Sequence, residues 1–110
     1  MSSAAKQQAQ LRAELEKYLA QHVGQEFTFE DFAETFHPAS YELLGIILGQ
    51  LVQAGRLKQI IRVYSTKVPG GGIADFDSLK DVPSQIFDIR GGVNMEVTGE
   101  DIRVIYKVLR

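Results

Sequence analysis

The chain has 110 residues, of which 45% are hydrophobic and 24% charged, and this is the composition of an ordinary globular protein of one domain. It contains no cysteine, which excludes disulfides, thiolate catalysis and cysteine-ligated zinc. The formal net charge of −2 hides an asymmetry. Residues 1–54 carry three basic and seven acidic side chains, whereas residues 55–110 carry nine basic and seven acidic ones. A dedicated nucleic-acid module usually has a clearer basic surface.

The N-terminal residues have no apolar core of the kind that a signal peptide needs. The longest uncharged apolar stretch, residues 43–52, is too short to span a bilayer and contains two glycines. We therefore expect a cytoplasmic protein with no membrane partner.

The first predicted helix covers residues 3–23. Leu11, Leu15, Tyr18 and Leu19 follow the spacing of one buried helical face. Gly24 is the expected end, since glycine readily adopts the left-handed conformation found after helix C-termini. Residues 1–8 have little to bury and are expected to be disordered.

Two further helices are predicted by capping signals. Thr28-x-x-Asp31 has the form of a capping box, with Phe27 and Phe32 as a hydrophobic staple, and Pro38 limits this helix to residues 29–36. The next helix covers residues 40–54, with Ser40 as its N-cap and Gly55 at its end.

The second half of the chain has the pattern of a small antiparallel sheet. Residues 57–66 are rich in β-branched side chains and predict a strand, and residues 68–72, with one proline and three glycines, predict a loop. We expect residues 73–82 to be irregular. Short strands are predicted at residues 86–88 and 93–97, joined by a turn at residues 90–92, followed by one helical turn capped by Thr98 and a last strand from about residue 102. The predicted fold class is α+β.

The order of these elements resembles the winged helix-turn-helix superfamily. Two phrases carry the resemblance: Phe27-Thr28-Phe29-Glu30-Asp31-Phe32-Ala33, and Leu48-x-x-Leu51-Val52-x-Ala54-Gly55-Arg56-Leu57. The resemblance implies three N-terminal helices followed by a small antiparallel sheet, in one domain spanning residues 1–110. Residues 68–101 are too long for a simple wing and would form an elaborated wing or extension. Residues 81–83 and 97–106 resemble winged-helix extensions in bacterial proteins associated with phage defence.

The helix that would read DNA in this superfamily lacks the side chains for that task. No lysine or arginine lies between Lys17 and Arg56, and Glu42 near the helix start would repel phosphates. The helix is instead rich in apolar residues, and Gly45 and Gly49 leave room for another backbone. This apolar surface either docks a partner or is covered by the C-terminal extension. The predicted function is therefore protein–protein contact, with another protein or a second copy, through candidate residues Tyr41, Leu43, Gly45, Ile47 and Gly49.

The alternative is a DNA-binding regulator that uses its wing. The candidate phosphate contacts are Arg56, Lys58, Arg62 and Lys67, on or beside the first wing strand. Charged side chains on an exposed strand also prevent aggregation, which explains them without a ligand.

The remaining motifs favour no enzyme, metal or cofactor. His22 and His37 lack the third and fourth ligands that a metal site needs. The glycines at positions 70–72 are not followed by the Lys-Ser or Lys-Thr of a P-loop. Asp75, Asp77, Asp81 and Asp88 lack the spacing of a calcium loop.

Overall fold

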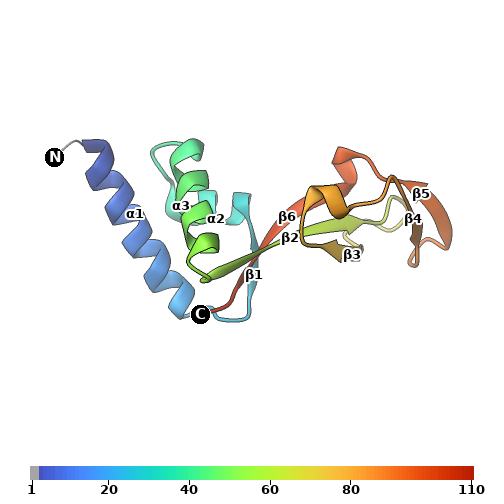
Figure 1. The fold of residues 1–110 in the computed structure, drawn as a ribbon, viewed down its shortest axis with the longest axis horizontal. Coiled ribbons are helices and arrows are strands. Elements are labelled where there is room, and N and C mark those ends of the chain that lie inside the picture. Colours follow the sequence, from blue (N-terminus) through green and yellow to red (C-terminus); the bar gives the residue numbers. More distant parts are fainter. Residues whose placement is uncertain (1–2) are drawn as a thin grey trace. The chain divides into compact units, whose positions relative to one another are not determined.

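In the computed structural model, which describes residues 3–110, the chain forms an α+β fold of helices and two antiparallel sheets (Figure 1). The predicted class is therefore confirmed at this level. The α-helices are α1 (Ser3–Ala20), α2 (Phe29–Phe36) and α3 (Tyr41–Gln53). The strands are β1 (Glu26–Thr28), β2 (Leu57–Tyr64), β3 (Gly72–Phe76), β4 (Gln85–Asp88), β5 (Val93–Glu96) and β6 (Ile102–Val108), with 3-10 turns at Leu79–Asp81 and Gly99–Asp101.

The strands form more than the single small sheet that was predicted. One sheet has four strands in the order β1-β6-β2-β3, and the other consists of β4 and β5. The chain also divides into two units. Unit 1 contains the residues up to Lys58 together with Tyr106–Arg110, and unit 2 contains Gln59–Ile105. Strands β2 and β6 contribute residues to both units.

The three helices begin and end close to the predicted positions. Thr28 caps α2: its hydroxyl accepts the amide of Asp31 at 3.1 Å, and its own amide donates to the Asp31 carboxylate at 2.8 Å. Ser40 caps α3 by accepting the amide of Leu43 at 3.1 Å. Gly24 and Gly55 both have a positive φ, of 86° and 73°, as expected for residues that follow helices.

Helix α1 differs from the prediction in detail, whereas α2 covers residues 29–36 as predicted. Helix α1 ends at Ala20, three residues earlier than expected, and the backbone turns through residues 21–24 before β1. Its first described residues, 3–8, are helical although most of their side chains are exposed. Helix α2 ends before Pro38 because His37 adopts the left-handed conformation, with a φ of 46°. Proline disfavours right-handed helical backbone in the preceding residue, so helix α2 stops there.

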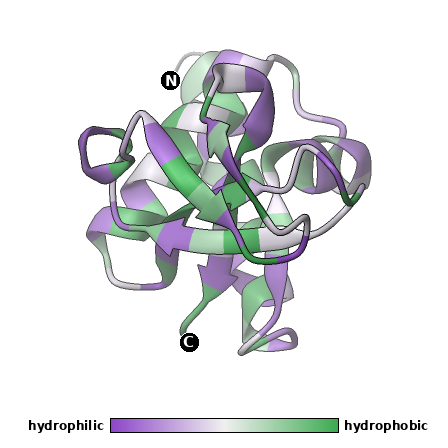
Figure 2. Cartoon of the chain, turned by 90° about the vertical axis from the view of Figure 1, so that its right-hand side faces the viewer, coloured by the Kyte–Doolittle hydropathy of each residue, from purple (hydrophilic) through white to green (hydrophobic). Residues whose placement is uncertain are grey.

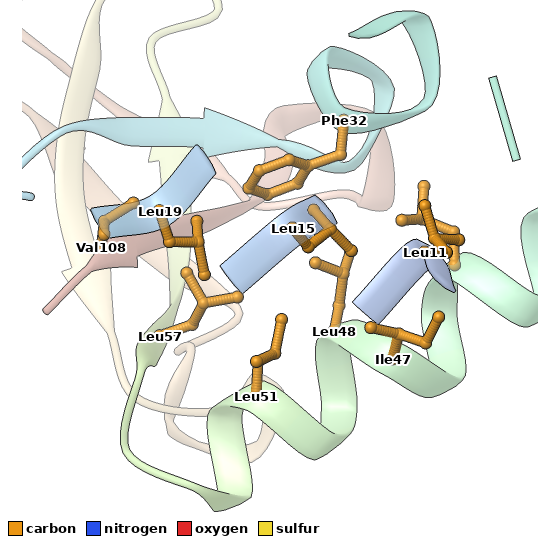
Figure 3. Packing of buried hydrophobic residues seen from close by; sticks show 10 residues of the cluster. Leu11, Leu15, Leu19, Phe32, Ile47, Leu48, Leu51, Leu57 and Val108 are labelled. Carbon is orange, nitrogen blue, oxygen red and sulfur yellow. The ribbon is translucent and has the colours of Figure 1, made fainter. Parts of the chain in front are cut away.

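The core of unit 1 is built by side chains from all three helices and two strands. Figure 3 shows side chains of this cluster pointing toward one another. They are Leu11, Leu15 and Leu19 of α1, Phe32 of α2, Leu44, Ile47, Leu48 and Leu51 of α3, Leu57 of β2 and Val108 of β6. The buried positions of α1 are four residues apart, which places them on one helical face.

Aromatic rings surround Phe32 in this core. The ring centroid of Phe32 lies 5.2 Å from that of Phe27, the predicted staple partner, and 6.1 Å from that of Tyr106. Burial raises the pKa of the Tyr106 hydroxyl, and the charge of Glu30 acts in the same direction. Tyr106 therefore stays neutral at physiological pH and serves as a packing residue.

Unit 2 consists of strand pairs with short connections. Strands β2 and β3 pair antiparallel with Ile61 opposite Phe76, and β4 and β5 pair with Phe87 opposite Asn94. The prediction of irregular structure at residues 73–82 is therefore wrong for its first part, because Gly72–Phe76 forms β3. Hydrophilic and hydrophobic residues alternate in bands along the strands (Figure 2), as expected for strands with one buried face.

Within residues 3–110, no helix combines the length and the apolar composition needed to cross a membrane.

Candidate protein-binding surface on the third helix

Helix α3 has two faces of different character. The side chains of Leu44, Ile47, Leu48 and Leu51 point into the core and are 0% exposed. The prediction of Ile47 as a contact residue is therefore not supported, because its side chain packs inside unit 1. A residue three or four positions from another buried one lies on the same helical face, and this spacing relates Ile47 to Leu44 and Leu51.

The opposite side of the helix is exposed and has little charge. We call this surface, formed by Tyr41, Glu42, Gly45, Ile46 and Gly49, the outer face of α3. Tyr41 is 71% exposed and Ile46 is 48% exposed, so this surface presents two large hydrophobic side chains. Ile46 was not among the predicted contact residues, although it lies one position from Gly45. Glu42 is the one acidic or basic residue among these five.

The two glycines of the outer face leave the backbone of α3 accessible. A Cβ atom added at Gly49 would meet no other atom within 4 Å, and one at Gly45 would meet only the Phe29 ring, at 3.9 Å. The Phe29 ring also packs edge-on against Tyr41, with ring centroids 6.0 Å apart. This aromatic pair borders a smooth strip of backbone that another helix can approach closely.

Leu43, the remaining predicted contact residue, lies elsewhere. It is half-buried and lines a hollow of about 260 Å³ with Leu11 and Pro38, away from the outer face of α3. The structure therefore groups Tyr41, Gly45 and Gly49 on one surface and places Leu43 and Ile47 outside it.

The four predicted phosphate contacts are distributed over both units. In unit 1, Arg56 donates from its Nε to the carbonyl of Arg110 at 2.7 Å, and Lys58 is exposed. In unit 2, Arg62 forms an ion pair with Asp75 at 2.8 Å, and Lys67 is exposed. The guanidinium groups of Arg56 and Arg62 are thus engaged by acceptors of the protein itself.

Arg62 and a further arginine, Arg90, lie beside the glycines at positions 70–72. Arg62 and Arg90 line an open depression of about 520 Å³ together with Tyr64 and Asp75. The side-chain stems of Arg90 and Arg62 approach Gly71 and Gly72 so closely that a Cβ there would lie 2.5 Å and 2.9 Å from them. Arg90 also donates from its Nε to the carbonyl of Gly72 at 3.1 Å. Glycine at positions 71 and 72 therefore leaves room for the aliphatic parts of the Arg90 and Arg62 side chains.

Among residues 3–110, Asp88 carries the one buried carboxylate, and a hydrogen-bond network that links two segments of unit 2 holds it. Asp88 accepts a short hydrogen bond from the hydroxyl of Ser65, and its other oxygen accepts the amides of Arg90 and Gly91 at 2.9 and 2.8 Å. The Ser65 oxygen in turn accepts the amides of Lys67 and Val68. The bond from Ser65, with help from the two amides and the charge of Arg90, lowers the pKa of Asp88 against the opposing effect of burial.

This network fixes the turn between β4 and β5. A Cβ at Gly91 would lie 2.7 Å from the Asp88 carboxylate, so only glycine fits there without a shift. Both carboxylate oxygens of Asp88 already accept hydrogen bonds from the protein, which indicates a structural role for this side chain. Sequence reasoning did not single out Ser65, and considered Asp88 only as a calcium ligand. An aspartate two residues before an Arg-Gly-Gly turn is the signal that was available.

The positions of His22 and His37 indicate structural roles for both side chains. His22 stacks on Tyr18 with ring centroids 3.9 Å apart, and its Nδ1 lies 2.7 Å from the Tyr18 carbonyl oxygen. His37 ends α2. Among residues 3–110, no group of three or more histidine, aspartate or glutamate side chains is placed to hold a metal ion.

Comparison of the chain with protein-family models, curated proteins and solved structures gives no match.

Proposed function

We propose that this chain is a non-catalytic winged-helix module that acts through protein–protein contact, with the outer face of α3 as the contact surface. The observation that carries the proposal is the exposed Tyr41 and Ile46 beside two accessible glycines, on a helix without a cation. The winged-helix assignment is supported by the element order α1-β1-α2-α3-β2 and by the entry into β2 just after Gly55. Residues 65–101 would then be an insertion between the strands of the wing.

The partner that this surface fits is a second copy of the chain. Two α3 helices that cross antiparallel, with Gly45 of one opposite Gly49 of the other, can approach closely because neither glycine has a side chain. In this arrangement Glu42 of one copy faces the region of Gln53 of the other, so the two glutamates stay apart. A two-fold contact of this kind is self-complementary, as in most homodimers.

The self-association is expected to depend on Gly49. Replacing Gly49 with lysine places a long charged side chain in the contact, and we expect the dimer dissociation constant to rise at least about tenfold, the effect of roughly 1.4 kcal/mol. The variant should fold normally, because a Cβ at this position meets no other atom and lysine favours a helix more than glycine. Sedimentation equilibrium over a range of concentrations measures the change.

The matched control is Ala13→Lys, which makes the same change of charge at an exposed position of α1. It should associate like the unmodified chain. A chain that stays monomeric up to millimolar concentration, or a Gly49→Lys variant that associates as well as the control, would contradict the proposed contact.

The DNA-binding alternative makes a different prediction. If Arg56, Lys58, Arg62 and Lys67 contacted phosphates, the affinity for any duplex would fall steeply as salt rises. We expect no such binding in a fluorescence-anisotropy titration with a labelled duplex at about 50 mM salt, because Arg56 and Arg62 are engaged within the protein. Tight, salt-sensitive binding that is lost when all four residues are replaced by alanine would establish the alternative.

A further inference from the structure

Strands β4 and β5 form a sheet of two strands, so each of them has one edge that pairs with no other strand of residues 3–110. The register places Gln85 opposite Glu96 and Phe87 opposite Asn94. A hairpin of two strands is marginal by itself, and sheets usually contain more strands. The outer edge of β4, on the side away from β5, is therefore a place where a further strand can be added.

The hydrogen bonds of the hairpin show which backbone groups of β4 point outward. The carbonyls of Ser84 and Asp88 accept amides from the β5 side, at 2.9 and 2.8 Å, so the backbone of both residues faces β5. Backbone direction alternates along a strand, and the N–H and C=O groups of Gln85 and Phe87 therefore point away from β5. Within residues 3–110, no hydrogen bond uses these four groups.

The side chains at this edge are uncharged and partly apolar. Phe87 is 55% exposed, and Ile89, just beyond the strand, is 70% exposed. Side chains two positions apart lie on one face of a strand, so Gln85 and Phe87 share the exposed face, whereas Asp88 is buried on the other. The outer edge of β5 carries Glu96 instead. A charged side chain opposes the addition of a strand, and the outer edge of β4 lacks one on its exposed face.

Unpaired backbone groups on a strand edge match an extended peptide, whose own donors and acceptors repeat at the same spacing. A helix would not satisfy them, because its backbone groups are paired within it. In antiparallel pairing, the peptide residue opposite Phe87 exchanges two hydrogen bonds with it, and so does the residue opposite Gln85. The side chains of these two peptide residues then lie on the same face as Phe87, where apolar groups shield its ring from water. Pro83 has no N–H, which limits the match at the start of β4.

A second copy of the chain would also offer a strand, but its pairing here would add to the proposed contact between α3 helices. Two different two-fold contacts on one chain join copies into open-ended assemblies unless the two axes close them. A strand from a different protein leaves the number of copies unchanged. The choice of a different protein over a second copy therefore rests on the proposed function.

We propose that the outer edge of β4 binds an extended segment of a partner protein in antiparallel orientation, with apolar side chains opposite Gln85 and Phe87. This edge belongs to unit 2 and shares no residue with the outer face of α3.

The test uses a seven-residue peptide with blocked ends, Lys-Thr-Val-Thr-Val-Thr-Lys, titrated into the full ¹⁵N-labelled chain and followed by NMR. We expect saturable shifts of the Gln85 and Phe87 amides and slower exchange of both with solvent, because they gain acceptors. A peptide that is N-methylated at both valines loses two donors to the edge and should bind at least about threefold more weakly. Methylation of the second and fourth residues, whose N–H groups point away from β4, should leave binding unchanged.

Proline substitutions on the two edges of the hairpin provide matched variants. Gln85→Pro removes an outward N–H of β4 and should weaken binding of the unmethylated peptide at least about threefold. Glu96→Pro makes the same change directly opposite, on the outer edge of β5, and should bind like the unmodified chain. Both variants should keep the hairpin, because neither N–H bonds within it and proline is tolerated at such edge positions. If Gln85→Pro loses the hairpin, the two methylated peptides decide.

The proposal is overturned if no shifts appear at millimolar peptide, if the two methylated peptides bind equally, or if a folded Gln85→Pro variant binds as well as Glu96→Pro. It is also overturned if the Gln85 and Phe87 amides shift with the concentration of the chain alone, since a second copy would then be the occupant. Peptide binding by a chain that stays monomeric in sedimentation would contradict the proposed α3 contact and leave the β4 edge as the binding site.

Discussion

Replacing Phe32 with alanine is expected to lower the free energy of unfolding by about 3–5 kcal/mol. The Phe32 side chain is 1% exposed and contacts rings from two other elements of unit 1, those of Phe27 on β1 and Tyr106 on β6. Its loss removes apolar contact area and leaves a cavity that rigidly placed neighbours fill only in part. Urea unfolding followed by circular dichroism at 222 nm, which reports on the three helices, measures the effect.

Phe87 offers the same substitution at an exposed site. Its side chain is 55% exposed on strand β4, so Phe87→Ala should change the free energy of unfolding by no more than about 0.5 kcal/mol. Equal losses for the two variants would mean that Phe32 is not the centre of the core described for unit 1.

Replacing Asp88 with asparagine is expected to destabilise the chain at neutral pH and to remove part of its sensitivity to acid. The folded state lowers the pKa of Asp88 below the usual value of about 3.9, so the ionised form stabilises the fold above that pH. This contribution is lost as the pH falls through the folded-state pKa. The stability difference between the unmodified chain and Asp88→Asn should thus be constant above about pH 5 and should shrink below it. Urea unfolding at a series of pH values tests this.

Two variants accompany this measurement. Ser65→Ala removes the hydroxyl that donates to Asp88 and accepts the amides of Lys67 and Val68, and should cost about 1–3 kcal/mol because buried polar groups lose their partner. Glu100→Gln neutralises an exposed carboxylate of the same unit and should change little at any pH. A stability difference for Asp88→Asn that stays constant down to pH 2 would contradict the role assigned to the Asp88 charge.

Local signals were sufficient to predict the helices. The capping boxes at Thr28 and Thr98, the cap at Ser40 and the glycine after α3 each depend on residues within a few positions of one another, and all are present in the structure. Short-range hydrogen bonds of this kind are fixed by sequence order alone.

Features that depend on distant residues were missed. Strand β3 has glycine, alanine and aspartate in a run of five and gains its structure by pairing with β2. Ile47 was predicted to lie on the contact surface but is buried. Residues 43, 44, 46, 47 and 48 are all apolar, so the sequence did not show which side of α3 faces the core. The burial of Asp88 depends on Ser65, 23 residues earlier.

The division of the chain has a consequence for its synthesis on the ribosome. Val108 is part of the core of unit 1, and it exchanges backbone hydrogen bonds with Gly24 and Gln25. All of Gln59–Ile105 is translated before Val108. The helices therefore leave the ribosome long before the strand that completes their core, whereas unit 2 has all its residues earlier. At roughly 5–20 residues per second, several seconds pass in which the apolar faces of α1 and α3 depend on each other, or on a chaperone, for protection from water.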